Sequence, residues 1–77
     1  MKEINLDTDF IFQEIGKNIK KLREEKGLTQ EELAFFIDSA RNYVGCIERG
    51  EKHPSIKTLY KIATALDTKI NKILINI

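Results

Sequence analysis

The segment from residue 29 to residue 50, TQEELAFFIDSARNYVGCIERG, constrains the fold more than any other part of the chain. Its first half predicts a short helix that begins with a capping box. The Thr29 hydroxyl can accept from the amide of Glu32, while the Glu32 side chain reaches back to the amide of Thr29. Asp38 and Ser39 then favour a tight turn, since short polar side chains bond nearby amides and Asp tolerates positive φ. The apolar stripe of this helix consists of Leu33, Ala34 and Ile37.

A second helix is predicted from about residue 40 to residue 49, and Gly50 ends it as a residue that adopts a left-handed conformation freely. At about 100° per residue, its apolar positions fall on one side. These are Ala40, Val44 and Ile47. The opposite arc carries no carboxylate and consists of Arg41, Asn42, Gly45, Cys46 and Arg49. Arg and Asn pair bidentately with guanine and adenine edges in the major groove, so this arc predicts contact with DNA.

With these two helices in place, residues 15–74 resemble the helix-turn-helix domain of Cro and repressor proteins of lambdoid phages, the XRE-type family. The matching pieces, in chain order, are Leu22-Arg23, GLTQEELA, Tyr43-Val44, IERG, Pro54-Ser55, Thr58-Leu59, KIA and Ala65-Leu66. The piece YVGCIERGE is also similar to the controller proteins of restriction-modification systems. The resemblance implies an all-α, compact five-helix lambda-repressor-like domain.

The chain of 77 residues predicts a single domain spanning 1–77, with a core small enough that dimerisation would help stabilise it. The net charge is only +1, but residues 1–38 carry more acidic than basic side chains and residues 39–77 the reverse. The basic half therefore begins where the DNA-facing helix begins.

One cysteine excludes an internal disulfide, and one Cys with one His cannot complete a usual zinc site, so neither metal nor cofactor is expected. No apolar run is long enough for a membrane span, and the N-terminus is no signal peptide. We therefore expect a soluble, cytoplasmic protein.

Outside the central segment, the pattern predicts three further helices and no strand. Residues 1–8 are polar and expected to be a loose N-terminus, while residues 70–77, INKILINI, form an apolar C-terminal segment. The expected helices cover about residues 9–26, 56–66 and 68–75. The fourth helix would turn inward Ile56, Leu59, Ile62, Ala63 and Leu66.

The resemblance assigns roles to side chains on both motif helices. Arg41 and Asn42 match positions that contact base edges. Gln30 matches a glutamine that contacts a phosphate, although an ordinary first-turn residue is the alternative. Gly45 and Cys46 would permit close approach to the bases, and Gly inside a helix suggests such a steric need.

Other expected contacts lie at the edges of this surface. Tyr43 either reaches a phosphate or sugar through its hydroxyl or closes the edge of the core. DNA-backbone contacts are expected from Arg49, Lys52, His53 and Ser55, of which Ser55 would also cap the fourth helix. No Ser, Cys or carboxylate motif accompanies His53 and nothing nearby forms a relay with Cys46, so no catalytic residue is proposed.

Several positions depart from the family pattern. Asp38 stands where Gly is usual, which predicts mild strain or an altered turn. Ala40 stands where Ser or Thr commonly caps the helix, so Ser39 or Asp38 could take over the cap and move the helix start by one residue. Phe35 and Phe36 replace polar residues, and either pack on the first or fifth helix or form a partner patch.

Two structural expectations complete the set. Arg23 and Glu48 match a family pair and are expected to form a partly buried structural ion pair. The apolar C-terminal segment, at Ile73, Ile75 and Ile77 and joined by Phe36, is expected to form a dimer interface.

These observations predict a sequence-specific transcriptional regulator that binds double-stranded DNA as a homodimer on a palindromic operator, with a restriction-modification controller as the favoured kind. A phage-type repressor or an antitoxin-type autoregulator is the alternative within the class. The alternative from another class is a protein-interaction module that uses Phe35, Phe36 and the apolar tail without binding DNA. No enzymatic activity, small-molecule ligand or membrane association is expected.

Overall fold

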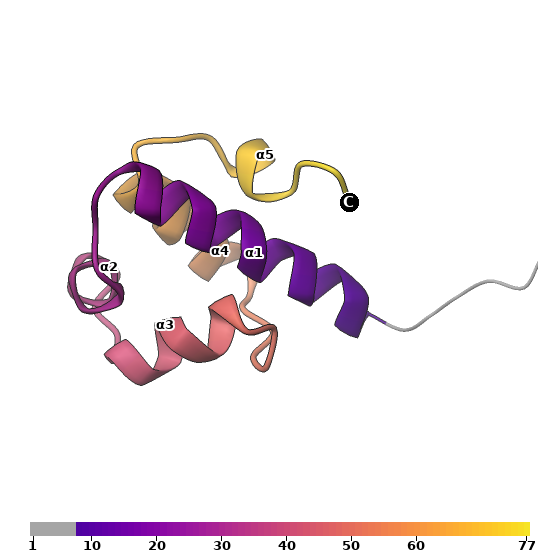
Figure 1. Ribbon diagram of the computed structural model, residues 1–77, viewed down its shortest axis with the longest axis horizontal. Helices are drawn as coiled ribbons and strands as arrows, with labels where there is room; N and C mark the ends of the chain where they lie inside the picture. The colour runs from indigo at the N-terminus through magenta and orange to yellow at the C-terminus, as the bar shows by residue number, and fades with distance from the viewer. Residues whose placement is uncertain (1–7) are drawn as a thin grey trace, which may run out of the picture.

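The computed structural model describes residues 8–77, and within this range it contains five helices and no strand (Figure 1). The helices are α1 (Asp9–Glu25), α2 (Gln30–Phe36), α3 (Arg41–Glu48), α4 (Ile56–Ala65) and α5 (Ile70–Ile73). The prediction of an all-α five-helix domain is confirmed. The expected loose N-terminus concerns residues 1–8, of which 1–7 lie outside the described residues.

The long helix α1 is the central element of the arrangement. It packs against α3 on one side and against α5 on another, while α2 packs on both α3 and α4 and α4 also contacts α5 (Figure 1). The apolar stripes of these helices meet in one core. Its buried members are Ile15, Ile19, Leu33, Ala34, Ile37, Val44, Ile47, Leu59, Ile62, Ala63, Leu66 and Ile73.

Two helix starts follow from side-chain caps that the sequence predicts. At α2 the Glu32 amide donates to Thr29 Oγ1 at 3.0 Å, and the Thr29 amide donates to Glu32 Oε1 at 2.9 Å, so the capping box is confirmed. At α4 the Thr58 amide donates to Ser55 Oγ at 3.1 Å, which confirms that Ser55 is the cap.

The turn between α2 and α3 depends on a left-handed residue that is not glycine. Asp38 has φ of 55°, its amide donates to Phe35 O, and the next amide, of Ser39, donates to Ala34 O at 2.8 Å. This is the paired hydrogen-bond pattern that commonly ends helices with a glycine at the left-handed position. The altered turn expected at Asp38 is therefore an ordinary helix ending with an aspartate in the strained position.

The start of α3 corrects one expectation. Ala40 itself is the N-cap residue, with extended backbone and no side-chain cap bond, so neither Ser39 nor Asp38 takes over the cap. Ala40 is also exposed rather than part of the apolar face, because the cap position precedes the first helical turn that packs on the core. The first helical residue is Arg41.

Ile56 corrects a second expectation, since it is 68% exposed rather than turned inward. It is the first residue of α4, where the chain enters from solvent, and the buried stripe begins one turn later at Leu59.

The fifth helix is shorter than the range 68–75 predicted for it. The Thr68 amide donates to Ala63 O at 2.9 Å and so belongs to the C-terminal end of α4. The fifth helix therefore starts later and is a single turn from Ile70 to Ile73. The backbone that follows is held by Asn18 of α1, whose Nδ2 donates to Ile73 O at 2.8 Å and to Ile75 O at 2.9 Å.

Burial also corrects part of the expected dimer interface. Ile73 is fully buried within the monomer core, so it is not available to a second copy. Ile75 and Ile77 remain 48% exposed. Phe36 is exposed as well, but it borders a groove with α4 residues, whereas Ile75 borders a hollow with α1 residues, so the two do not share one patch.

Main-chain contact between α1 and α3 is a feature that the sequence analysis missed. A Cβ atom on Gly16 would collide with the carbonyl oxygen of Ile47 and would lie 2.6 Å from the carbonyl oxygen of Glu48. Only glycine permits the two helices to approach this closely.

Candidate nucleic-acid interface

The outer face of α3 is set by what its inner face packs against. Val44 and Ile47 are 1% exposed and lie in the core, which turns Arg41 and Asn42 outward into solvent. Both side chains extend from the first turn of α3, directly after the turn that follows α2. The N-terminal end of the second motif helix is thus exposed to solvent.

A polar hollow joins this face to the start of α2. It is lined by Gln30, Arg41, Asn42, Gly45 and Arg49, and so brings together five of the ten residues predicted to contact DNA. Gly45 is buried and forms the floor, because the side chains of Gln30 and Arg49 lie over it. The hollow offers guanidinium and amide groups, which are the donors and acceptors that pair with base edges and phosphates.

Gln30 is fixed by a chain of hydrogen bonds that reaches into the core. Its Nε2 donates to Glu48 Oε1 at 3.0 Å. Glu48 also accepts from Arg23, with Nε at 2.6 Å from Oε2 and Nη2 at 3.1 Å from Oε1, and Arg23 Nη1 donates to Leu28 O at 2.7 Å. The resemblance implied the Arg23–Glu48 pair, but no spacing in the sequence indicated that Gln30 joins it.

Arg49 forms an ion pair with Glu51, a residue to which the sequence assigned no role. Its Nε donates to Glu51 Oε2 at 2.9 Å and its Nη2 to Glu51 Oε1 at 3.3 Å, and Nη2 also lies 3.5 Å from Cys46 Sγ. The hydrogen bond from Arg49 lowers the pKa of the Glu51 carboxyl, and the bond to Glu51 raises the pKa of Arg49. Both groups are therefore charged at neutral pH.

The loop before α4 is anchored to α1. The His53 ring stacks on Phe12 with centroids 4.2 Å apart and an interplanar angle of 9°, and His53 Nε2 lies 3.3 Å from Asp9 Oδ1. Lys52 is exposed, whereas the Ser55 hydroxyl caps α4 and also donates to Thr58 Oγ1 at 3.2 Å. Three residues of this loop are predicted to contact the DNA backbone, and of these His53 and Ser55 make contacts that hold the fold, whereas Lys52 is exposed.

Two other predicted contact residues are only partly accessible. Tyr43 is half-buried and its ring packs against the core, and Cys46 is half-buried beside Arg49. Packing against the core agrees with the alternative in which the Tyr43 ring closes the core edge, while its hydroxyl contact stays a prediction.

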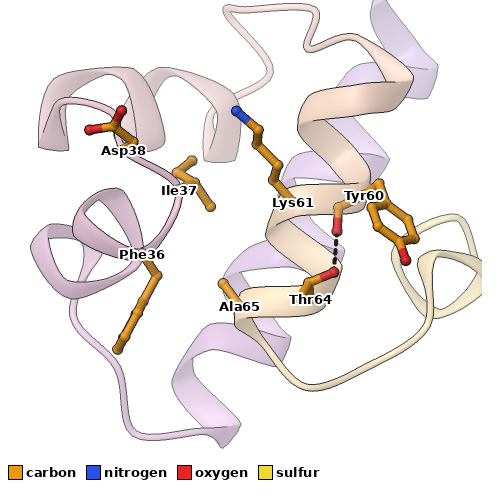
Figure 2. Close-up of a pocket in the computed structure, with 7 residues that line it drawn as sticks. All are labelled: Phe36, Ile37, Asp38, Tyr60, Lys61, Thr64 and Ala65. Carbon is orange, nitrogen blue, oxygen red and sulfur yellow. Dashed lines mark hydrogen bonds between the residues drawn. The ribbon is translucent and has the colours of Figure 1, made fainter.

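A second surface feature lies away from this face. Phe36, Ile37, Asp38, Tyr60, Lys61, Thr64 and Ala65 line an open groove between the end of α2 and α4. Figure 2 shows Phe36 at the end of α2 and Ala65 across from it on α4, with the ring of Tyr60 on the opposite side of the α4 ribbon in this view. Phe35 and Phe36 are 79% and 60% exposed and stand edge to face with centroids 5.8 Å apart, so they do not pack on α1 or α5 as one expectation had it.

Within residues 8–77, no group of three or more His, Cys, Asp or Glu side chains is placed to hold a metal ion. None of the described helices is long and apolar enough to cross a membrane.

A capped helix, a tight turn and a second helix with an outward polar face define a helix-turn-helix protein of the kind that places its second helix in the major groove. A family model described as Helix-turn-helix matches residues 19–73, and the chain belongs to this family, the XRE-type DNA-binding transcription regulators. Regulators of this family bind double-stranded DNA and are generally not enzymes.

Similar proteins and structures include controllers of restriction-modification systems. Control protein C.SmaI of Serratia marcescens is 35% identical over 72 residues, which cover 88% of this chain and 86% of the relative. The uncharacterized HTH-type transcriptional regulator y4dJ of Sinorhizobium fredii is 44% identical over 52 residues, or 68% of each chain. The crystal structure of the restriction-modification controller protein C.AhdI from Aeromonas hydrophila matches with a TM-score of 0.78 at 40% identity, covering 80% of this chain and 94% of that one.

Proposed function

We propose that this protein is a sequence-specific transcriptional regulator that binds a palindromic operator as a homodimer and controls a restriction-modification system. The observation that carries the proposal is the polar hollow on the outer face of α3, where Arg41 and Asn42 lie beside Gln30 at the start of α2. The similarity to C.SmaI and C.AhdI supports the choice of controller.

In the proposed complex, α3 enters the major groove. Arg41 would donate to the O6 and N7 atoms of a guanine, and Asn42 would pair with an adenine edge. The first amides of α2 and the Gln30 side chain would meet a phosphate, since helix N-termini attract anions. Lys52 and His53 would contact the backbone from the loop before α4.

The electrostatics of the motif support this docking. Glu48 is the acidic residue of α3, and its carboxylate is buried and paired with Arg23 rather than facing the DNA. The exposed first turn of α3 would therefore present Arg41 to the major groove without a competing carboxylate on the same helix.

The homodimer is proposed from the exposed apolar tail. Ile75 and Ile77 are each 48% exposed and Leu74 is 37% exposed, which is an unusual cluster at a chain end. Asn18 holds the backbone of this segment on α1, so the side chains project from a fixed support. To match a palindromic site, a two-fold dimer formed there must hold its two α3 helices about 34 Å apart, one turn of DNA.

A second candidate function is protein interaction through the aromatic pair. Phe35 and Phe36 are exposed beside the groove at α4, and acidic residues flank them, namely Glu31, Glu32 and Asp38. The groove shares no lining residue with the polar hollow on α3, so a partner contact there is compatible with DNA binding. Such a contact would also explain the exposed rings if the protein bound no DNA.

Selection from a random duplex library tests the proposal. We expect a palindromic consensus with half-sites about one helical turn apart, and an affinity for it that falls steeply between two salt concentrations. Arg41→Ala should flatten the selected consensus at one base pair of the half-site while the protein remains folded. Binding that depends on salt but yields no consensus would contradict sequence-specific regulation, and no binding at low salt would favour the interaction module.

A further inference from the structure

We propose that Arg49 recognises a guanine edge in the operator, and that Glu51 is the residue that positions it for this contact. The inference rests on the proposed function, and it changes the role of Arg49 from the DNA-backbone contact expected from the sequence to a second specificity determinant. Four features of the structure support it.

The first feature is the place of the guanidinium group. Arg49 lines the same hollow as Arg41 and Asn42, on the face of α3 that would enter the major groove. Its side chain turns back over Gly45, so that a Cβ atom at Gly45 would lie 3.2 Å from Arg49 Nη1. The guanidinium therefore lies one turn closer to the start of α3 than the Arg49 backbone does.

The second feature is the way in which Glu51 holds the group. The carboxylate accepts hydrogen bonds from Nε–H and from one Nη2–H, and these two N–H groups form one edge of the guanidinium. The end of the fork remains, since Nη1 has no hydrogen-bond partner among the described residues and Nη2 otherwise meets only the sulfur of Cys46, a weak acceptor. This end carries the pair of N–H groups that matches O6 and N7 of guanine.

The third feature is charge. A guanidinium that already forms a two-point ion pair with a carboxylate is locally neutralised, so its attraction for phosphates of any sequence is weakened. Directed N–H groups without net local charge favour a base edge over the DNA backbone. Glu51 is thereby expected to raise the ratio of specific to non-specific binding.

The fourth feature is the absence of a side chain at Gly45. Its Cα forms the floor of the hollow between Gln30 and Arg49, and a methyl group there would press on Nη1. The open space allows the guanidinium to lie flat against α3, where the edge of a base pair can reach it. Gly45 thus has a steric role in placing Arg49 as well as in permitting close approach.

The test compares full-length variants on the operator selected for the wild-type protein and on every single-base-pair change of that operator. Arg49→Lys keeps the charge but removes the fork, so discrimination at one guanine should fall by about 5- to 150-fold, the range of one good bidentate pair. Glu51→Gln should weaken discrimination at the same guanine while it strengthens binding to random duplex. Lys52→Ala is the matched control in the same loop and should weaken all duplexes alike, with discrimination unchanged.

Both side chains are exposed, so the variants should fold as the wild type does, which circular dichroism checks. If Arg49→Lys weakens binding to all duplexes equally and keeps the preference at every base pair, Arg49 is a phosphate contact. That result would overturn this inference but not the proposed function. Full discrimination in Glu51→Gln would remove Glu51 from the positioning role. A wild-type protein that selects no consensus would overturn the proposed function and this inference together.

Discussion

Arg23 of α1 and Glu48 of α3 form a two-point ion pair inside the protein, with their side chains only 9% and 2% exposed. The same carboxylate accepts from Gln30 at the start of α2, so one buried group links three helices. The hydrogen bond to Glu48 raises the pKa of Arg23 above its ordinary value, and the guanidinium therefore stays charged at every pH at which the protein would be handled.

Glu48→Ala should destabilise the protein strongly, because it leaves the Arg23 guanidinium buried without its partner. Removal of one member of a buried pair costs about 3–5 kcal/mol. Lys17→Ala is the matched control, since it removes an exposed ion pair with Glu14 and should change stability by less than about 1 kcal/mol. Denaturant unfolding measures both variants, and equal midpoints would contradict a structural role for the buried pair.

Gly16→Ala should also destabilise the protein, by at least about 1–3 kcal/mol, because the added methyl group meets main-chain atoms of α3 that cannot move aside. Gly45→Ala is the same change in another helix interior, where the nearest neighbour is Nη1 at the far end of the exposed Arg49 side chain, 3.2 Å away, and Gln30 lies at ordinary van der Waals distance. There the gain in helix propensity should leave stability unchanged or raise it by about 0.5–1 kcal/mol. A melting temperature of Gly16→Ala that is no lower than that of the wild type would refute the close approach at Gly16.

Arg41→Ala should cost about 1–3 kcal/mol on the operator and should flatten the preference at one base pair. Lys52→Ala should instead weaken all sequences to a similar extent and reduce the slope of log affinity against log salt by about one. Titrations at several salt concentrations separate the two effects. An unchanged consensus after Arg41→Ala would mean that α3 docks in another orientation.

Replacing Ile75 and Ile77 by serine should shift sedimentation toward the monomer and weaken operator binding, while the helical circular dichroism is retained. Both side chains are half exposed and neither belongs to the buried core, so the fold does not depend on them. Ile73→Ser is the informative contrast, because that residue is fully buried and its replacement should unfold the monomer. A doubly substituted protein that still sediments as a tight dimer would locate the interface elsewhere.

The Arg49–Glu51 pair makes a prediction about pH. Because Arg49 lowers the pKa of Glu51, the pair's contribution is present above the ordinary carboxyl pKa of 4.5 and is lost as the pH falls through the lowered value. An NMR titration of the Glu51 side-chain carbon should therefore give a midpoint below 4.5 in the wild type and a higher one in Arg49→Ala. Identical midpoints would mean that the two groups do not interact in solution.

Local sequence signals predicted most of the fold, because the features concerned span only a few residues. The capping box of Thr29 and Glu32 and the cap at Ser55 depend on residues three positions apart, and both are present. The limits of α5 were missed for a related reason. The Thr68 amide donates to Ala63 at the end of α4, so Thr68 cannot be the start of a longer α5.

The details of the interface needed the tertiary structure. Gln30 meets Glu48 across 18 residues, and Gly16 meets Ile47 across a still longer separation, so no periodicity connects them. A glycine inside a predicted helix was a signal for close approach at Gly45, and the same signal at Gly16 could have been used. The Arg49–Glu51 pair is short in sequence, but its geometry depends on Gly50, which turns the chain with φ of 76°.

The contact at Gly16 has a consequence for the DNA. Where α1 meets α3 through main-chain atoms, no side-chain rotamer can change to let α3 tilt against the rest of the protein. In the proposed dimer, a mismatch between the spacing of the two recognition helices and the pitch of the duplex would then have to be absorbed by bending the operator. Operators with flexible TA or CA steps between the half-sites should therefore be bound more tightly than operators with a stiff A-tract there, even if no side chain contacts those base pairs.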